Sequence, residues 1–273
     1  MIRLAVRTPT HAADRVLAAL LELAPSGVEQ VDGDGWVEYA VYGAPGELPA
    51  LAEGEAEVAG VRVRVSGTEV AEDWAERWKR FHVPVLVGGR VYLRPPWEDA
   101  PVSPGVVDVV VDPGQAFGTG SHPTTRLCVE LLLGLADEGR AEGSLADLGC
   151  GSGVLAIAAA KLGWDPVNAV DSERAAVTAT LANARDNGVL LERVERADLR
   201  DDPPPAADTV VANLTRPLLL RLAEGREPLP RALILSGLLE HEGDEVAAAF
   251  APLVETRRLT DRGWSAVLLE PCT

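Results

Sequence analysis

The sequence predicts two domains: a small N-terminal α+β domain of the ferredoxin-like kind and a larger C-terminal α/β domain with a Rossmann-like parallel sheet. Through residue 66 the hydrophobic pattern gives the order strand–helix–strand–strand–helix–strand, which is that of a split βαβ motif. After about residue 100, near-continuous apolar strands alternate with helices, as in a parallel sheet covered on both faces. With 273 residues, 47% of them hydrophobic, the chain is long and apolar enough for two cores.

In the N-terminal domain, residues 1–66, strands are predicted from alternating apolar residues and helices from apolar residues at helical spacing. We expect strands over 2–7, 28–31, 36–41 and 61–65, and helices over 11–24 and 50–55. Pro25 and Gly27 end the first helix, and the run Asp32-Gly33-Asp34-Gly35 has the composition of a turn. The domain shows no catalytic constellation. We therefore expect it to recognise the substrate, with a purely stabilising role as the alternative.

Residues 67–100 are expected to form a linker. The stretch 69–80 has the pattern of a short helix, on which Trp74 and Trp78 share one face because they are four residues apart. Pro95 and Pro96 then interrupt regular structure.

The C-terminal domain, residues 101–273, is expected to alternate strands and helices. The expected strands cover 106–111, 145–148, 167–170, 194–196, 209–212, 232–236 and 264–269. The expected helices cover 123–135, 154–162, 175–187, 218–223 and 242–249. The last strand is expected to close the sheet.

The charge and the cysteines exclude several classes of function. The net charge of −17 argues against general nucleic-acid binding, which needs clustered Lys and Arg. It suits a basic partner, although the charge taken by itself is explained as well by solubility alone. The three cysteines, Cys128, Cys150 and Cys272, have no zinc spacing, and an odd, scattered set fits reduced thiols in a cytoplasm. The four histidines are far apart, so no metal site is expected. No signal peptide and no membrane-spanning run are visible, so a cytoplasmic protein is expected.

A glycine loop follows the strand that begins at Leu145. Gly149, Gly151 and Gly153 let the backbone turn sharply and approach a ligand closely. A dinucleotide fingerprint would need glycine at the sixth position, where Val154 stands. The pattern is instead the variant of S-adenosylmethionine-dependent methyltransferases, in which the loop lies against the methionine part of the cofactor. An ordinary glycine-rich turn is the alternative.

Two acidic residues follow the next strands. Asp171 comes 22 residues after Gly149, where an acidic side chain accepts hydrogen bonds from both ribose hydroxyls; it could instead cap the next helix. Asp198 could accept a hydrogen bond from the adenine amino group, or it could be an acid on the surface. Both are predicted cofactor contacts.

Asn213 ends a further apolar strand, and its amide offers both a donor and an acceptor. It could position the amine that accepts the methyl group, or hold the methionine end of the cofactor, and we take it as the candidate catalytic residue. Amino-methyltransferases often continue from such a residue with two prolines and an aromatic residue. Here Leu214-Thr215-Arg216 follows instead.

The loop over 112–125 leads into a helix and is rich in glycine and threonine. Hydroxyls and free backbone N–H groups at a helix start suit a carboxylate, and the methionine carboxylate of the cofactor is the candidate. Predicted cofactor contacts in this loop are Phe117, Gly118, Thr119 and Thr125. His122 could be a base, although a single histidine of this kind more often orients a loop.

These motifs together resemble one family, the bacterial methyltransferases of large-subunit ribosomal protein eleven. The resemblance rests on residues 116–125 joined to the Gly149 loop and to residues 211–214, with 72–78 similar to the family's linker. It implies a substrate-recognition domain, a mobile linker and a Rossmann-like catalytic domain. It also implies S-adenosylmethionine as cofactor and methylation of lysine ε-amines and the N-terminal α-amine of that ribosomal protein. Thr125, Gly149, Asp171 and Asn213 match the family's cofactor contacts.

The expected mechanism is direct displacement at the cofactor's methyl group, in which the protein aligns the reactants and excludes water. The alternatives are another methyl acceptor (a glutamine side chain, a small molecule or RNA), a nicotinamide dehydrogenase, and a silent binding module for the ribosomal protein. Nucleic acid is not expected to be required, and a monomer is the working expectation.

Overall fold

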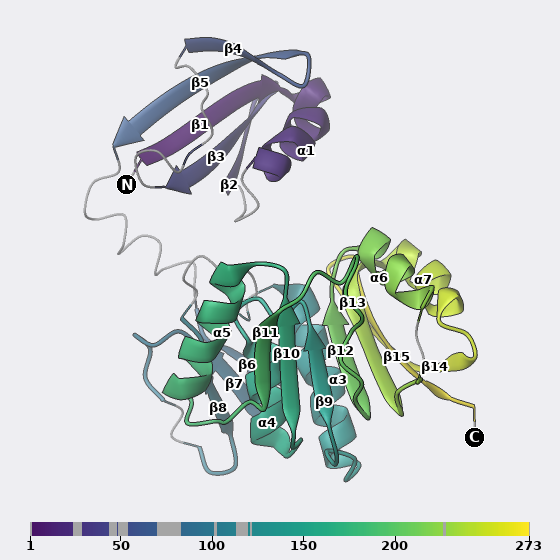
Figure 1. Cartoon of the computed structure of the whole chain (residues 1–273). Helices are drawn as coiled ribbons and strands as arrows, with labels where there is room; N and C mark the ends of the chain where they lie inside the picture. The colour runs from purple at the N-terminus through teal and green to yellow at the C-terminus, as the bar shows by residue number, and fades with distance from the viewer. Residues whose placement is uncertain are drawn as a thin grey trace. The chain divides into compact units, whose positions relative to one another are not determined.

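The computed structural model describes residues 2–23, 29–43, 48, 54–69, 83–100, 103–112, 120, 122–225 and 228–272. The chain divides into two compact units, Met1–Phe81 and His82–Thr273 (Figure 1). The helix expected over 69–80 lies, past Glu69, outside the described residues. The later part of the expected 67–100 linker differs from that expectation, because β6 (Val85–Val87) and β7 (Val91–Arg94) are strands of the second unit. Val87, Val91 and Leu93 are buried in its core.

The first unit is an antiparallel sheet with one described α-helix. Its elements are β1 (Ile2–Pro9), η1 (Thr10–Ala12), α1 (Ala13–Leu23), β2 (Glu29–Gly33), β3 (Trp36–Gly43), β4 (Gly54–Val58) and β5 (Val61–Glu69). The strand order is β2-β3-β1-β5-β4, and the first four follow the split βαβ arrangement that the sequence predicts. Val16 and Leu20 of α1 are fully buried against Val6 and other inward-facing residues of the sheet.

The prediction of a helix over 50–55 is wrong at its last two residues, because Gly54 and Glu55 begin β4. Residues 50–53 lie outside the described part. The segment from 54 alternates exposed residues with the more buried Ala56 and Val58, and it pairs with β5 across a tight turn. Pairing with the neighbouring strand overrides helix propensity here.

The second unit is built on a seven-stranded sheet of order β11-β10-β9-β12-β13-β15-β14. These strands are β9 (Leu145–Leu148), β10 (Val167–Asp171), β11 (Arg193–Arg196), β12 (Thr209–Asn213), β13 (Ala232–Leu239), β14 (Leu253–Asp261) and β15 (Trp264–Pro271). The first five in that order are parallel, and β15 is antiparallel to both of its neighbours. A small sheet of β6, β7 and β8 (Val107–Val110) completes the unit.

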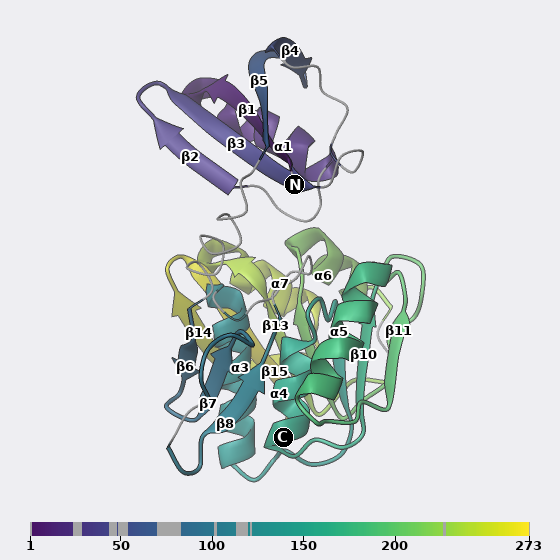
Figure 2. The same cartoon turned by 90° about the vertical axis from the view of Figure 1, so that its left-hand side faces the viewer.

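Helices cover both faces of the large sheet (Figures 1 and 2). They are α3 (Pro123–Asp137), α4 (Val154–Leu162), α5 (Arg174–Asp186), α6 (Arg216–Ala223) and α7 (Gly243–Ala249), with η2 (Glu240–Glu242) before the last. Core residues of α3, α4 and α5 form one buried cluster and those of α6 and α7 another. Val211 belongs to the first cluster and Val210 to the second, so successive residues of β12 face opposite layers. The predicted Rossmann-like α/β class is confirmed.

The strand order places the predicted site at the centre of this sheet. The chain runs outward from β9 through β10 to β11, then returns to β12 on the other side of β9. A reversal of this kind is where open α/β sheets bind ligands, beyond the carboxyl ends of the strands. No helix among the described residues is long and apolar enough to cross a membrane.

Candidate active site

The glycine loop after β9 adopts a backbone that favours glycine. Gly149, Gly151 and Gly153 have φ angles of +76°, +53° and +83°. A Cβ on Gly153 would stand 2.8 Å from Thr180 Cγ2, and one on Gly149 would stand 2.3 Å from Leu214 Cδ2. The loop is tied to β10 as well, because the N–H groups of residues 149 and 150 both donate to the Val170 carbonyl, at 2.9 and 3.0 Å. These constraints hold the loop at the strand ends.

Asp171 lies directly beside this loop. Its Oδ2 accepts the N–H of Gly151 at 2.9 Å, and its Oδ1 accepts the N–H of Glu173 at 2.9 Å. One bond orders the glycine loop and the other orders the turn into α5. The structure thus brings Asp171 and Gly151 together. It does not show the helix cap that the sequence left as the alternative, because the N-cap of α5 (Arg174–Asp186) is Glu173 and no side chain caps it.

Asp147, in the strand below the loop, is completely buried. Its Oδ2 accepts the N–H of Ala156 at 3.0 Å, while its Oδ1 has no hydrogen-bond partner in the described part of the chain. Burial raises the pKa of this carboxyl to about 7, the Ala156 bond opposes the rise, and the charge of Asp171 adds to it. The carboxyl therefore binds a proton more readily than an exposed one.

Asn213 is the third predicted residue at this edge, and its amide is held by the start of α3. Its Nδ2 donates to Thr124 Oγ1 at 3.1 Å, and the same hydroxyl lies 2.8 Å from His122 Nδ1. Since an amide nitrogen only donates, the hydroxyl accepts from Asn213 and gives its own hydrogen to His122. No described residue bonds to Asn213 Oδ1, so the acceptor end of the amide stays available.

His122 caps α3 by accepting the N–H of Thr124 at 3.4 Å. Nδ1 is thus an acceptor, which requires the neutral ring with its proton on Nε2. Burial, and secondarily the charge of Arg126, lower the pKa of His122. The ring also packs edge-on against Trp264, with centroids 4.9 Å apart. The geometry supports an orienting role for His122 rather than that of a base.

Thr125 begins the same helix and is 1% exposed. Its Oγ1 is buried and makes no hydrogen bond with the described residues. Buried hydroxyls nearly always have a partner, so this one points to a group that binds here. Phe117, Gly118 and Thr119 lie outside the described residues.

Asp198 follows β11 at the same sheet edge, but its carboxylate is engaged. It forms a two-pronged pair with Arg200, at 2.9 Å to Nε and 2.8 Å to Nη2. Hydrogen bonds from Arg200 lower the pKa of Asp198 to about 2. A contact with an adenine amino group would have to share these oxygens.

Two residues that the sequence did not single out connect the site to its surroundings. Asn183 of α5 is 2% exposed; its Nδ2 donates to the Ser152 carbonyl at 2.8 Å, and its Oδ1 accepts the N–H of Asp112 at 3.0 Å. Asn187, one turn later, exchanges hydrogen bonds with the backbone of Val110. Asn183 and Asn187 are four residues apart, so they share one face at the end of α5. Two amide side chains on a face expected to be apolar are the sequence feature from which these residues could have been predicted.

Comparison with known proteins decides the family. Residues 2–270 match the family described as "Ribosomal protein L11 methyltransferase (PrmA)". The chain belongs to this family. A relative of the same description from Pectobacterium carotovorum (strain PC1) is 44% identical over 184 residues, which cover 66% of this chain and 61% of that protein. One from Caldanaerobacter subterraneus is 33% identical over 78% of this chain and 69% of its own length.

A solved structure agrees with this assignment. The ribosomal protein L11 methylase of Lactobacillus delbrueckii subsp. bulgaricus is 30% identical, with a TM-score of 0.62, and the match covers 70% of this chain and all of that one. The L11 methyltransferase family that the sequence motifs resembled is thereby confirmed. Because the family match spans 2–270, it includes the described residues of both units.

Proposed function

We propose that this protein transfers methyl groups from S-adenosylmethionine to lysine ε-amines and the N-terminal α-amine of ribosomal protein L11. The single observation that carries the proposal is the fixed amide of Asn213, whose acceptor atom is open at the carboxyl end of β12 beside the glycine loop. The shared family supports the substrate. We assign substrate recognition to the N-terminal residues 1–66, and catalysis to the C-terminal unit.

The residues present fit the methyl donor. The Thr125 hydroxyl near the start of α3, which has no hydrogen-bond partner within the described residues, suits the methionine carboxylate, because helix starts present free N–H groups to anions. The glycine loop is held at the carboxyl ends of β9 and β10, and Asp171 stands where it could receive the ribose hydroxyls. Phe117, Gly118, Thr119 and Asp198 remain proposed contacts. When bound, this group supplies an electrophilic methyl on a sulfonium, which is a good leaving group.

The protein's part in the reaction is to select and aim a neutral amine. A lysine ammonium has no lone pair, and with a reference pKa near 10.4 the neutral amine is scarce at pH 7. Asn213 Oδ1 would accept one N–H of that amine, which aims the nitrogen lone pair away from the amide. The bound cofactor would supply the methyl group, and the role of Asn213 would be to hold the amine in line with it until the extra proton of the methylated amine passes to water. No general base is needed in this scheme.

The test is mass spectrometry of unmethylated L11 after incubation with the enzyme and S-adenosylmethionine, which should add mass in steps of about 14 Da at amines. Asn213→Ala should slow methylation by about 100-fold, in the range that positioned catalytic contacts contribute. Asn213→Asp is the matched control for size. A carboxylate cannot donate to Thr124, so it should be slow as well. Normal methylation rates in both variants would refute the proposed role of Asn213. If the wild-type enzyme left L11 unmodified, the proposal that L11 is the substrate would be refuted.

We further propose that the protein acts in the cytoplasm and needs no nucleic acid. The described cysteines are all free thiols, with Cys128 and Cys150 buried and Cys272 exposed. The charge of −17 disfavours an RNA substrate and attracts a basic protein.

A further inference from the structure

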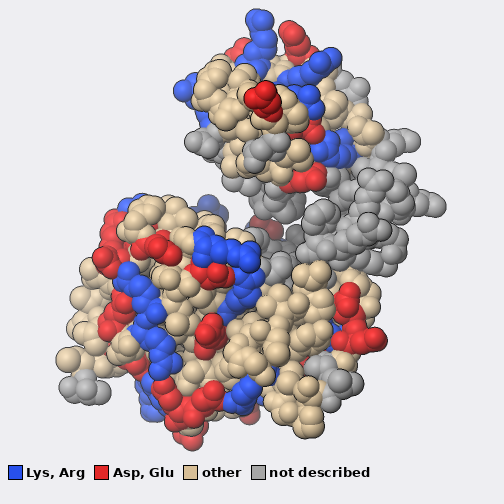
Figure 3. Space-filling model, turned by 180° about the vertical axis from the view of Figure 1, so that it is seen from behind, with Lys and Arg blue, Asp and Glu red and all other residues tan. Residues whose placement is uncertain are grey.

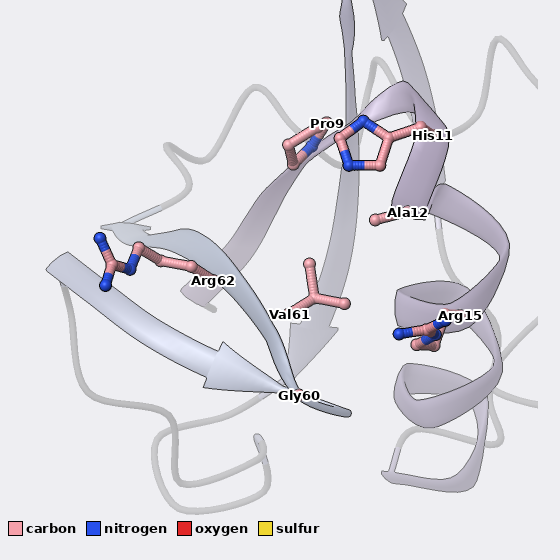
Figure 4. A pocket seen from close by; sticks show the side chains of 7 residues that line it. All are labelled: Pro9, His11, Ala12, Arg15, Gly60, Val61 and Arg62. Atoms are coloured by element: carbon pink, nitrogen blue, oxygen red, sulfur yellow. The ribbon is translucent and has the colours of Figure 1, made fainter.

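A hollow of about 380 Å³ lies in the N-terminal unit, between the start of the helical segment and the β4–β5 turn. Its apolar surface comes from Pro9, Ala12 and Val61, and its nitrogen-bearing side chains are those of His11, Arg15 and Arg62. Figure 4 shows His11 and Arg15 on the helix side of the hollow and Val61 and Arg62 on the strand side. Two elements far apart in sequence thus place positive charge around one apolar floor.

The two arginines of the hollow, Arg15 and Arg62, have no acidic partner among the described residues, which is unusual in this protein. Residues 1–66 contain five arginines and ten acidic residues, a net charge of −5. Arg3 and Arg7 are both paired with Glu38. Within the described residues, Arg15 and Arg62 form no hydrogen bond or ion pair, and both are exposed.

The larger unit shows the contrast. Its arginines are mostly paired with acids: Arg257 with Glu138, for example, and Arg216 with Glu245. Figure 3 shows blue and red side chains side by side on one face of this unit. Among the described residues of the N-terminal unit, Arg15, Arg62 and Arg64 form no ion pair, and two of these three line the apolar hollow.

We propose that this hollow binds an acidic side chain of the protein substrate, namely that of a glutamate. The apolar floor suits an aliphatic stem, and the cationic rim suits its carboxylate, which an Arg guanidinium can bind with two parallel hydrogen bonds. The inference rests on the proposed function, because it takes the partner to be a protein. The net negative charge of the protein would attract a basic substrate, and the contact between its glutamate and the arginines of the hollow would set its orientation.

A protein carboxylate fits better than a nucleic acid. Binding an RNA backbone needs many cations in a stripe, whereas this hollow offers two arginines in a segment of net negative charge. A bare phosphate group would leave the apolar floor unused. A glutamate uses both parts.

The first test compares Arg15→Glu/Arg62→Glu with Arg64→Glu in the full-length protein. Arg64 is the matched control, because it lies on β5 two residues after Arg62, is exposed on the same side of the strand, and does not line the hollow. For the double variant we expect the KM for L11 to rise about 10-fold, since two exposed pairs become repulsive. The kcat and the Kd for S-adenosylmethionine should stay within twofold, and so should every constant of Arg64→Glu.

The second test does not depend on methylation. Nα-acetylglutamate amide titrated into the full-length protein should shift the side-chain NMR signals of Arg15 and Arg62, but not that of Arg64, and inorganic phosphate should shift them less. If the wild type leaves L11 unmethylated, the proposed function is refuted. In that case this titration alone tests whether the hollow binds a glutamate side chain. Equal KM values for the double variant and Arg64→Glu would overturn the inference, as would unshifted arginine signals. So would a stronger response to a ribosomal RNA oligonucleotide than to the glutamate probe.

Discussion

Thr124→Val tests whether the orientation of the Asn213 amide matters for catalysis. The substitution keeps the shape of a side chain that is 1% exposed and removes only the hydroxyl. Asn213 Nδ2 then loses its acceptor at 3.1 Å, and His122 Nδ1 loses its donor at 2.8 Å. The amide is left free to rotate, and its acceptor end is no longer held toward the strand's open end.

The expected effect follows from the energy of one hydrogen bond. A neutral intramolecular bond contributes about 1 kcal/mol net, which corresponds to a factor of about 5 in rate. We therefore expect kcat for L11 methylation to fall roughly 5- to 10-fold. The free energy of unfolding should fall by about 1–2 kcal/mol, because two half-buried polar groups, on His122 and Asn213, lose a partner. Thr124→Ser keeps the hydroxyl and should keep kcat.

Thr209→Val is the matched control, read by steady-state methylation and by urea unfolding. Thr209 is 4% exposed, and its Oγ1 accepts the indole N–H of Trp164 at 3.1 Å, so the same chemical change also removes a side-chain hydrogen bond there. It stands at the opposite end of β12 from Asn213. It should cost similar stability and leave kcat unchanged. The reasoning is refuted if Thr124→Val turns over normally, or if Thr209→Val loses as much activity.

Three further predictions concern the surroundings of the site. Asn183→Asp turns the donor facing the Ser152 carbonyl into an acceptor, so S-adenosylmethionine should bind about 10-fold more weakly by calorimetry; an unchanged Kd would contradict the coupling. The pKa of Asp147 is raised to about 7, so the folded state binds more protons than the unfolded state between about pH 4 and pH 7. The free energy of unfolding of the wild type should therefore decline over that range. Urea unfolding of Asp147→Asn should show a flatter pH dependence. The pKa of His122 is lowered, so stability should instead fall as pH drops below about 6.5, where the unfolded histidine takes up a proton. His122→Asn keeps a capping side chain and should remove that slope, and a slope that persists would assign it to another group.

The parts of the site that could be predicted from sequence are those that local order determines. Gly149, Asp171 and Asn213 each follow directly on an apolar strand. In a parallel sheet all such positions share one edge, and β9 pairs with both β10 and β12, so the three come together without any knowledge of side-chain packing.

The strand β14, which the sequence analysis did not predict, lacks a clear hydrophobic period. β14 is an edge strand whose residues after Leu253 are exposed or half-buried, so charged side chains such as Arg257 and Arg258 replace the alternation that marks a strand. Asn183 was missed for the opposite reason. It is a buried polar residue in a helix, and only the fold shows that its partners are backbone groups of two separate loops.

The role of Asn213 shows where sequence alone stops and geometry continues the argument. An asparagine offers a donor and an acceptor, so the sequence left two roles open: positioning the methyl-accepting amine, or holding the methionine end of the cofactor. Thr124, 89 residues away, takes the donor. What remains is Oδ1, which only accepts. A carboxylate is also an acceptor and gains nothing from Oδ1. An amino group donates, and both the methyl-accepting amine and the α-ammonium at the methionine end of the cofactor are amino groups. The contact to Thr124 therefore limits Asn213 to a partner that donates, and it leaves the carboxylate to other groups, such as the Thr125 hydroxyl, which has no partner among the described residues.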